Sequence, residues 1–467
     1  MNACFAENNA GALPAPSATP AAVASGPVNL SVRPPQQMSA SITTIAVSAI
    51  FVGLLMLCWL WDAPNIIRSI PFPTLDETAT EGDGGKQIGI VLLLAAIMLV
   101  GIWDRGLSFV FGLPAIFIPV LLWCWLSVSW AIEPLVSLRR ISLTTIIVLI
   151  VAYVVQLLPY RRVVGVMCVG FVFVLLADWF AIAAFPMAIH QSNEIDPGLV
   201  GTWRGLHSNK NEAGAFAALC LVMLCHETAR TRSLVMLAAV LACAVFLFQT
   251  QSKTAMGCVL LALIAGGASH MFFNNAGLRR TVQWSVALAV VASIVVADEV
   301  ALRFAALFDD PGALTGRVQI WPVLMRFVAD HPLLGSGYGS YWAIGASSPI
   351  LTDGGGWLTT IDHSHNGYLE LLVHTGIVGL ILGLVCLIVL PLRSLFVSNL
   401  EAGVSRSLLT SVLVFGFLQN LLETSLLNRA NSTWVIMLVA YCLLAKATTV
   451  QDVPRLAQHS AVPLKVL

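Results

Sequence analysis

Two histidines, His363 and His365, stand two residues apart in a polar segment that runs directly into an apolar stretch at 367–392. His365 therefore lies at or just before the start of a predicted helix, where the helix dipole disfavours the imidazolium and keeps the ring neutral. A neutral histidine beside an anchored phosphate group can remove the proton of a sugar hydroxyl as a general base. His365 is the predicted base, with His363 in support, although a histidine at this position can also do no more than cap the helix.

The same segment allows a second chemistry, because Asp362, His363 and His365 are residue types that bind transition metals. Their spacing at positions i, i+1 and i+3 of a loop is compatible with a shared ion. No fourth ligand is evident in the surrounding sequence, so a metal site is the weaker of the two interpretations.

Four cations occur in polar segments beside apolar runs. Arg204 and Lys210 precede the run at 211–226, Lys253 lies in a Gln-Ser-Lys-Thr turn, and Arg317 follows a glycine. Helix N-termini attract anions through their free N–H groups and their dipole. Arginine binds phosphate with two parallel hydrogen bonds, whereas lysine acts as a point charge. The four side chains predict a site for the phosphate groups of a lipid, and the alternative is that they merely extend to lipid headgroups.

Two further residues are candidates for supporting roles. Glu370 lies just inside the apolar run that follows His365, where it can pair with a cation or face a wet cavity. Tyr338 belongs to the segment 335–339, Gly-Ser-Gly-Tyr-Gly, whose glycines predict a flexible lid. We expect both side chains to support the predicted site.

The rest of the chain must position these residues in a membrane. Of its 467 residues, 58% are hydrophobic and only 10% are charged, whereas a soluble domain carries about 25% charged residues. The formal net charge is zero, which gives no indication of binding to nucleic acid. The composition predicts an all-α polytopic membrane protein.

Twelve apolar runs are candidate transmembrane helices, although several are shorter than the ~20 residues that a spanning helix needs. They lie near 43–61, 88–103, 107–130, 141–158, 163–186, 211–226, 233–250, 255–273, 281–297, 367–392, 407–422 and 433–446. The run at 107–130 contains Pro114 and Pro119, which predict a kink.

The distribution of charges in the loops predicts the orientation of these helices. Residues 1–40 are rich in proline, alanine and serine and predict a disordered tail. If this tail is cytoplasmic, most loop arginines lie inside and most loop acids lie outside, as the positive-inside rule expects. The membrane domain then covers 41–447, with a large periplasmic loop at 298–366 between the ninth and tenth helices, and 448–467 forms a second cytoplasmic tail.

Three motifs in this chain resemble those of the O-antigen ligase and O-antigen or exopolysaccharide polymerase superfamily. The first is Trp203-Arg204-Gly205 with Lys210-Asn211. The second is Gly316-Arg317 followed by His331-Pro332-Leu333-Leu334-Gly335-Ser336-Gly337. The third is His365-Asn366, then nine residues, then Gly376-x-x-Gly379. The match covers roughly 200–380 by motif, and Lys253 stands where many relatives have arginine.

This resemblance implies a bacterial membrane glycosyltransferase of the C type that takes a glycan from an undecaprenyl-diphosphate donor at the periplasmic face. It implies that His365 is the base and that Arg204, Lys210 and Arg317 hold the diphosphate, so that no metal and no other cofactor is needed. The expected partners are the lipid-linked donor, a glycan or lipid A–core acceptor, the lipid bilayer of the inner membrane, a flippase and a chain-length regulator.

The family divides by acceptor, and the residues of these motifs are more similar to those of the exopolysaccharide polymerases than to those of the ligases. A ligase transfers the glycan to lipid A–core, whereas a polymerase adds it to another lipid-linked repeat unit. Two other classes stay open, a secondary transporter and a non-catalytic scaffold. Transporters place polar groups near the midplane in matched halves, whereas here the polar residues cluster toward one face and the halves are unlike.

Overall fold

The computed structural model describes residues 35–61, 63–68, 83–191, 197–275, 277, 316–397, 400, 404–429 and 431–459. The chain divides into two units, Met1–Ser41 and Ile42–Leu467, and the site lies within the second. In the described residues the regular structure is helical, apart from two isolated bridges, Ile189 with Trp203 and Ile344 with Ala346. The predicted tail at 1–34 and the final residues 460–467 lie outside the described residues.

The helices follow one another in this order: α1 Pro35–Trp59, α2 Ala63–Arg68, α4 Gly84–Arg105, α5 Ile118–Leu126, α6 Pro134–Leu157, α7 Tyr160–Ala184, α8 Lys210–Thr231, α9 Leu234–Gln249, α10 Lys253–Asn274, α13 Arg317–Asp330, α14 Pro349–Asp353, α15 Gly367–Leu384, α16 Leu390–Val397, α17 Arg406–Gln419 and α18 Ser432–His459. A π-helical turn at Val385–Val389 joins α15 to α16. The helix α18 continues through His459, into the segment predicted as a tail.

Among the described residues, six helical segments are long and apolar enough to cross a membrane, by length and composition. They are Ile42–Trp59, Gly84–Arg105, Pro134–Leu157, Tyr160–Ala184, Lys210–Thr231 and Gly367–Phe396. Shorter apolar helices occupy Ala115–Trp130, Leu234–Gln249, Lys253–Ser269, Arg406–Gln419 and Ser432–Thr448. Together these segments overlap every predicted run except 281–297, which lies outside the described residues. The helical polytopic class is therefore confirmed, and the total of twelve spans stays a prediction.

The run at 107–130 differs from the expected single kinked helix. It consists of short 3₁₀ turns at Leu107–Phe111 and Ala115–Phe117, then α5, then a 3₁₀ turn at Ser127–Trp130. Pro114 is extended, with ψ 128°, because proline lacks an N–H group and its ring clashes with a preceding helical turn. Pro119 is tolerated in the first turn of α5, where an N–H group has no helical partner.

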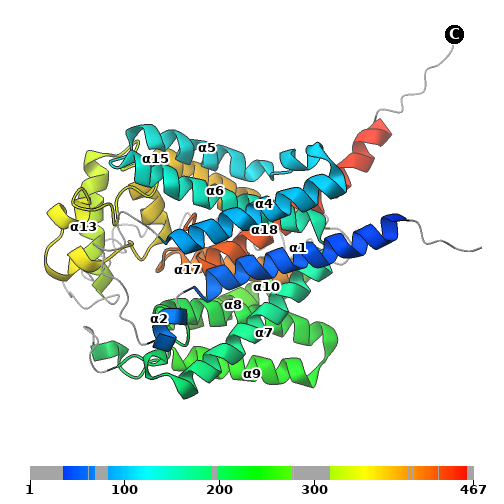
Figure 1. Cartoon of the computed structure of the whole chain (residues 1–467), viewed down its shortest axis with the longest axis horizontal. Helices are drawn as coiled ribbons and strands as arrows, with labels where there is room; N and C mark the ends of the chain where they lie inside the picture. The colour runs from blue at the N-terminus through cyan, green and yellow to red at the C-terminus, as the bar shows by residue number, and fades with distance from the viewer. Residues whose placement is uncertain are drawn as a thin grey trace, which may run out of the picture. The chain divides into compact units, whose positions relative to one another are not determined.

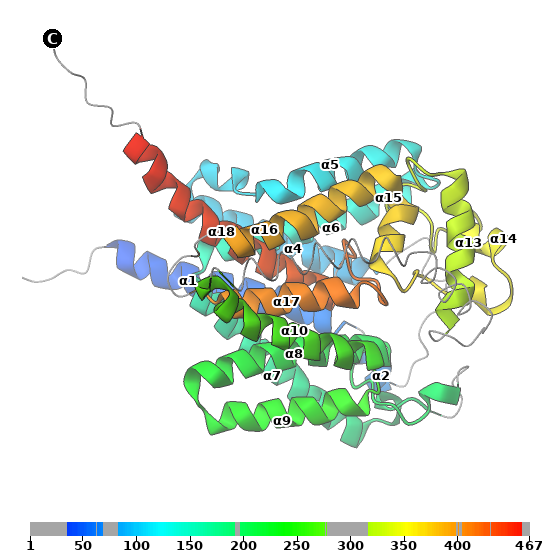
Figure 2. The same cartoon turned by 180° about the vertical axis from the view of Figure 1, so that it is seen from behind.

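The helices α8, α10 and α17 pack together in a way that brings three chain segments to one end of the bundle. Gly214 of α8 packs against Ser252, and Gly266 of α10 packs against Ser407 and Ser411 of α17. The late part of α10 thus lies beside the early part of α17, so the two helices are antiparallel. The start of α8, the start of α10 and the end of α17 lie at the same end, where α13 and the start of α15 are also found (Figures 1 and 2).

The glycine-rich segment predicted as a flexible lid is instead buried. Residues 335–342 are shielded from solvent, and Gly337 and Gly339 pack closely against Ala131 and Arg140 at the start of α6. The Ser336 N–H donates to Val373 O at 2.9 Å, which docks the segment onto α15. The glycines are needed for close approach between backbones rather than for motion, so the prediction of a lid is wrong.

The glycine motif after the histidines has a direct structural reason. Gly376 interrupts α15 with φ 65°, and a Cβ atom at this position would collide with Leu333 O. Gly335 lies against the same stretch of α15, and a Cβ atom at Gly335 would collide with Val373 O. The kink lets the backbone of α15 approach residues 333–335 closely.

Candidate active site

His365 lies immediately before α15 in an unusual backbone conformation. Its φ is 51°, in the left-handed region that residues with a side chain seldom adopt. The helix cap is Asn366, whose side chain accepts hydrogen bonds at 3.0 Å from the N–H groups of Tyr368 and Leu369. The alternative prediction, that His365 caps the helix, is therefore wrong. The surrounding contacts hold this histidine in its strained backbone conformation.

A chain of polar contacts connects the two histidines with carboxylates on either side. His363 Nδ1 lies 2.6 Å from Asp362 Oδ1, and His363 Nε2 lies 3.1 Å from His365 Nδ1. His365 Nδ1 also lies 3.2 Å from Oε2 of Glu423, a residue in the loop that follows α17. The other oxygen of Glu423 forms an ion pair with Arg317 at the start of α13. Five side chains from three separate segments thus form one network.

The hydrogen-bonding capacities of these groups determine where the protons lie. An ionised Glu423 can only accept, so its contact requires a proton on His365 Nδ1. When His363 is neutral, its Nε2 is then the acceptor nitrogen, and its proton lies on Nδ1, toward Asp362. In this arrangement every contact has one donor and one acceptor. It leaves the second nitrogen of His365, Nε2, without a hydrogen-bond partner in the part of the chain that the structure describes.

The electrostatic surroundings separate the two histidines. Burial, followed by the charge of His363, lowers the pKa of His365 to about 4, and the contact with Glu423 only partly opposes this. Burial also lowers the pKa of His363, but the charge and hydrogen bond of Asp362 outweigh it and raise the pKa to about 9. The first proton that the pair takes up therefore goes to His363. Burial is a larger cause of a neutral His365 than the helix dipole considered from the sequence.

Glu370 and Tyr338 hold the surrounding backbone in place. Glu370 Oε2 accepts the Ser364 N–H at 2.9 Å, between the two histidines. The hydroxyl of Tyr338 lies 2.8 Å from Thr144 Oγ1 and also donates to Leu427 O. Glu370 thus shapes the histidine loop, and Tyr338 ties the glycine-rich segment to α6 and to the loop after α17.

The four predicted cations do not all meet in one place. Arg317 is in the histidine network through Glu423 and is only 7% exposed. Arg204 is buried, and its Nε–H donates to Met187 O at 2.6 Å. Lys210 and Lys253 are the first residues of α8 and α10, and Lys253 is exposed. These three lie toward the same end of the bundle as Glu423, but only Arg317 has a defined contact with the network.

Residues 215–384 match the model of the O-antigen ligase family. This match supports the resemblance of the chain to the O-antigen ligase and polymerase superfamily. No curated protein matches the chain. The matched region includes Lys253, Arg317 and His365 with its two motif glycines, whereas Arg204, Lys210 and Glu423 lie outside it. The match points to a membrane enzyme related to glycosyl transfer and does not distinguish a ligase from a polymerase.

Several polar residues of the site were missed by the sequence analysis. Glu423 and Arg429 lie in the short segment between the last two apolar runs, and Arg140 lies early in α6. Asp178 lies within α7 and accepts from the Leu206 N–H at 2.9 Å and from His207 at 3.3 Å. An ionisable residue inside or at the edge of an apolar run is costly in a membrane and indicates a function or a buried partner. That signal could have identified all four.

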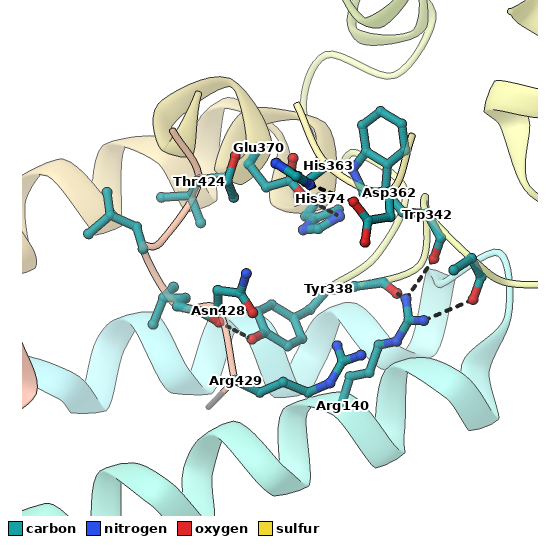
Figure 3. Close-up of a pocket in the computed structure, with 15 residues that line it drawn as sticks. Arg140, Tyr338, Trp342, Asp362, His363, Glu370, His374, Thr424, Asn428 and Arg429 are labelled. Carbon is teal, nitrogen blue, oxygen red and sulfur yellow. Dashed lines mark hydrogen bonds and ion pairs between the residues drawn. The ribbon is translucent and has the colours of Figure 1, made fainter. Parts of the chain in front are cut away.

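A cavity of about 340 Å³ is lined by residues of α6, α15 and three loops. Figure 3 shows Arg140, Arg429 and Tyr338 on one wall and His363, Glu370 and His374 on the opposite wall. Asp362 and His363 contribute to this lining, so the cavity and the histidine network share a boundary.

One set of ligand atoms is close enough to share a metal ion, namely those of His363, His365 and Glu423, which lie within 4.8 Å of one another. This set differs from the trio considered from the sequence, because Asp362 contacts the opposite nitrogen of His363. Each of the three already has a hydrogen-bond partner inside the set, and Arg317 supplies positive charge beside Glu423. Protein groups can thus account for the geometry.

Proposed function

We propose that this protein is an inverting membrane glycosyltransferase that polymerises undecaprenyl-diphosphate-linked repeat units into exopolysaccharide or O-antigen at the periplasmic face. The observation that carries the proposal is the state of His365. Its Nδ1 lies 3.2 Å from Glu423 Oε2, burial lowers its pKa to about 4 so that the ring stays neutral, and its Nε2 has no partner in the described residues. This is the arrangement of a general base whose orientation is set by a carboxylate.

In the proposed reaction, His365 Nε2 takes the proton from a hydroxyl group of the acceptor glycan. The hydroxyl oxygen attacks the anomeric carbon of the donor sugar, and the bond between that carbon and the diphosphate oxygen breaks. Undecaprenyl diphosphate leaves with the bonding electrons, and the anomeric centre is inverted. Glu423 stabilises the imidazolium that forms, because the proton on Nδ1 stays directed at its carboxylate.

His363 has a positioning role in this proposal. Both of its ring nitrogens are engaged, Nδ1 by Asp362 and Nε2 by His365, so neither is available to a substrate. When His363 takes up its extra proton, its Nε2–H faces His365 Nδ1, which must then accept. The proton of His365 moves to Nε2 in that form, and the base is blocked. Neutral His363 is therefore the active state.

Cations of the protein would stabilise the leaving diphosphate in place of a metal. Arg317 lies beside the base through Glu423, and its planar guanidinium suits two phosphate oxygens. Arg204, Lys210 and Lys253 would extend this positive surface along the end of the bundle. The proposal predicts that turnover persists in EDTA, and loss of activity that Mn²⁺ or Mg²⁺ restores would favour the metal interpretation.

The experiment that tests the function is incubation of the purified protein in lipid nanodiscs with a lipid-linked oligosaccharide donor. Growth of the glycan on the lipid supports the polymerase. Transfer to lipid A–core instead identifies a ligase, which is the alternative that the superfamily leaves open. Absence of turnover with either acceptor would refute glycosyl transfer and leave transport or scaffolding.

The periplasmic location has a separate test. Ser347 is an exposed residue in the loop between α13 and α15, on the side that the loop charges predict to be outside. A cysteine at this position should react with a membrane-impermeant maleimide in intact spheroplasts. Reaction only after lysis would reverse the orientation and with it the proposed periplasmic chemistry.

A further inference from the structure

The cavity beside His363 contains a concentration of hydrogen-bond donors that the proposed mechanism does not use. Arg140 and Arg429 line it, and the two guanidinium groups are near enough to repel each other. In the described part of the chain neither arginine has a carboxylate partner within 4.0 Å. The carboxylate of Asp362 in the same lining attracts both arginines, but it is already bound to His363, so a further anion would reduce the repulsion between them.

The two arginines differ in what they can offer to a ligand. Arg140 donates to the carbonyls of Trp342 and Ala343 at 2.7 and 2.8 Å, and to that of Gly339, so its guanidinium supports the glycine-rich segment. Arg429 forms no hydrogen bond or ion pair with the described residues. Figure 3 shows its guanidinium beside Arg140 at the cavity. Arg429 is thus the group with free capacity for an anion.

The acids around the cavity are already engaged. Asp362 is bound to His363 at 2.6 Å, and Glu370 accepts the Ser364 N–H and lies 3.5 Å from His374 Nε2. Three lining groups have buried nitrogen atoms with no hydrogen-bond partner, namely Arg140 Nε, the indole N–H of Trp342 and His374 Nε2. The cavity therefore offers an unpaired cation and spare polar positions, which fit an anionic ligand that also carries hydroxyl groups.

We propose that this cavity binds an acidic sugar of the acceptor glycan, with Arg429 as the partner of the sugar carboxylate. Its volume of about 340 Å³ is at the small end of the range for ligand pockets, which suits a single sugar. Trp342 and Tyr338 supply aromatic surface, and the shared boundary at His363 places the ligand next to the base. The assignment of this sugar to the acceptor glycan rests on the proposed function, whereas the presence of an acidic-sugar site does not.

The test compares the binding of two small probes, methyl glucuronoside and methyl glucoside, to the full-length protein in detergent. Saturation-transfer NMR titrations give a dissociation constant for each probe. We expect the wild-type protein to bind the glucuronoside about tenfold more tightly, since a hydrogen bond to a charged group is the difference between them. In Arg429→Gln the two constants should agree within about twofold, and Arg429→Lys should retain part of the preference.

Arg326→Gln is the matched control, because Arg326 is an exposed arginine of α13 that does not line the cavity. It should keep the tenfold preference. Equal binding of the two probes by the wild-type protein would overturn the proposal without any variant, so poor folding of Arg429→Gln cannot obscure the result. Displacement of the glucuronoside by inorganic pyrophosphate, together with loss of pyrophosphate binding in Arg429→Gln, would assign the cavity to the donor instead.

The outcomes separate this inference from the proposed function. Preferential binding of the glucuronoside without glycan transfer would refute the glycosyltransferase and keep the acidic-sugar site. Glycan transfer without preferential binding of the glucuronoside would support the glycosyltransferase and refute the acidic-sugar site. A sugar carboxylate could belong to a lipid-linked repeat or to a lipid A–core, and turnover with each of these acceptors distinguishes the two sources.

Discussion

The segments that precede α8 and α15 both place a histidine close to an asparagine that caps the helix. The two histidines differ in their burial and in their hydrogen-bond partners. Before α8, His207 is 4% exposed and contacts Asp178, which is fully buried. Before α15, the side chain of His365 is 24% exposed and only one of its ring nitrogens has a partner in the described residues. In the first segment His207 and Asp178 satisfy each other, whereas in the second Nε2 of His365 has no partner among the described residues.

This comparison shows that residue type and local spacing do not separate a scaffold from a reactive site. Arg204 and His207 are the kinds of residue that would suit a phosphate site, but Arg204 donates to backbone carbonyls and His207 to a buried carboxylate. Their contacts hold the loop in which they lie. What distinguishes His365 is hydrogen-bonding capacity left over after the protein's own contacts have formed.

The largest effect should come from His365→Ala. General base catalysis contributes about 10²–10⁴-fold, so this variant should lose at least about a hundredfold in initial rate while it still inserts in membranes and binds donor. His207→Ala should mainly lower the melting temperature, because it leaves Asp178 buried and unpaired. The rates are measured on lipid-linked donor at matched protein levels.

His363→Ala provides the control for that assignment and should lose much less activity than His365→Ala. If His365→Ala kept near-normal turnover and His363→Ala did not, the two roles would be reversed. If both kept it, positioning of the substrates by the cations would be the main source of catalysis.

Glu423→Gln should have the next largest effect, on the order of a hundredfold. The amide no longer requires a proton on His365 Nδ1, so the tautomer with a free Nε2 is less populated. Glu212→Gln is the matched control from the segment before α8, where Glu212 accepts from the Ser208 hydroxyl. A comparable loss of rate in both variants would mean that Glu423 has only a structural role.

Arg317→Lys should lower kcat/KM for the donor about tenfold, because lysine keeps the charge but not the planar pair of donors. Arg204→Lys should cost less, since Arg204 has no defined contact with the histidine network and its Nε–H serves Met187 O. Steady-state kinetics at several donor concentrations separate the effects on KM and kcat. Donor binding by Arg317→Ala at the wild-type level would refute the diphosphate role.

Asp362→Asn should shift the pH dependence. The active form needs neutral His363, so the wild-type rate should rise with pH through the pKa of His363, which Asp362 raises to about 9. Removing the Asp362 charge lowers that pKa, so the rise should move to lower pH, with a relative gain in rate near neutrality. The measurement is kcat/KM from pH 5 to 10. A shift to higher pH would contradict the blocking role of protonated His363.

The amino-acid sequence by itself determined the membrane class and the apolar segments, and it singled out His365 and Arg317 as candidates. These features depend on composition and on local spacing, because a helix needs only its own run of apolar residues to be stable in lipid. The spacing from His365 to Gly376 was also readable as a motif. The sequence could not show that Gly376 is the point where the backbone of segment 332–336 docks.

Tertiary structure decided which residues meet. Glu423 lies 58 residues from His365 and 106 residues from Arg317 along the chain, and no local pattern encodes contacts over such separations. Residues 335–342 are likewise buried by packing against α6 and α15. Their glycines alone had predicted a flexible lid. Whether a polar side chain is closed by its own contacts or available to a substrate depends on partners that only the folded chain brings within hydrogen-bonding distance.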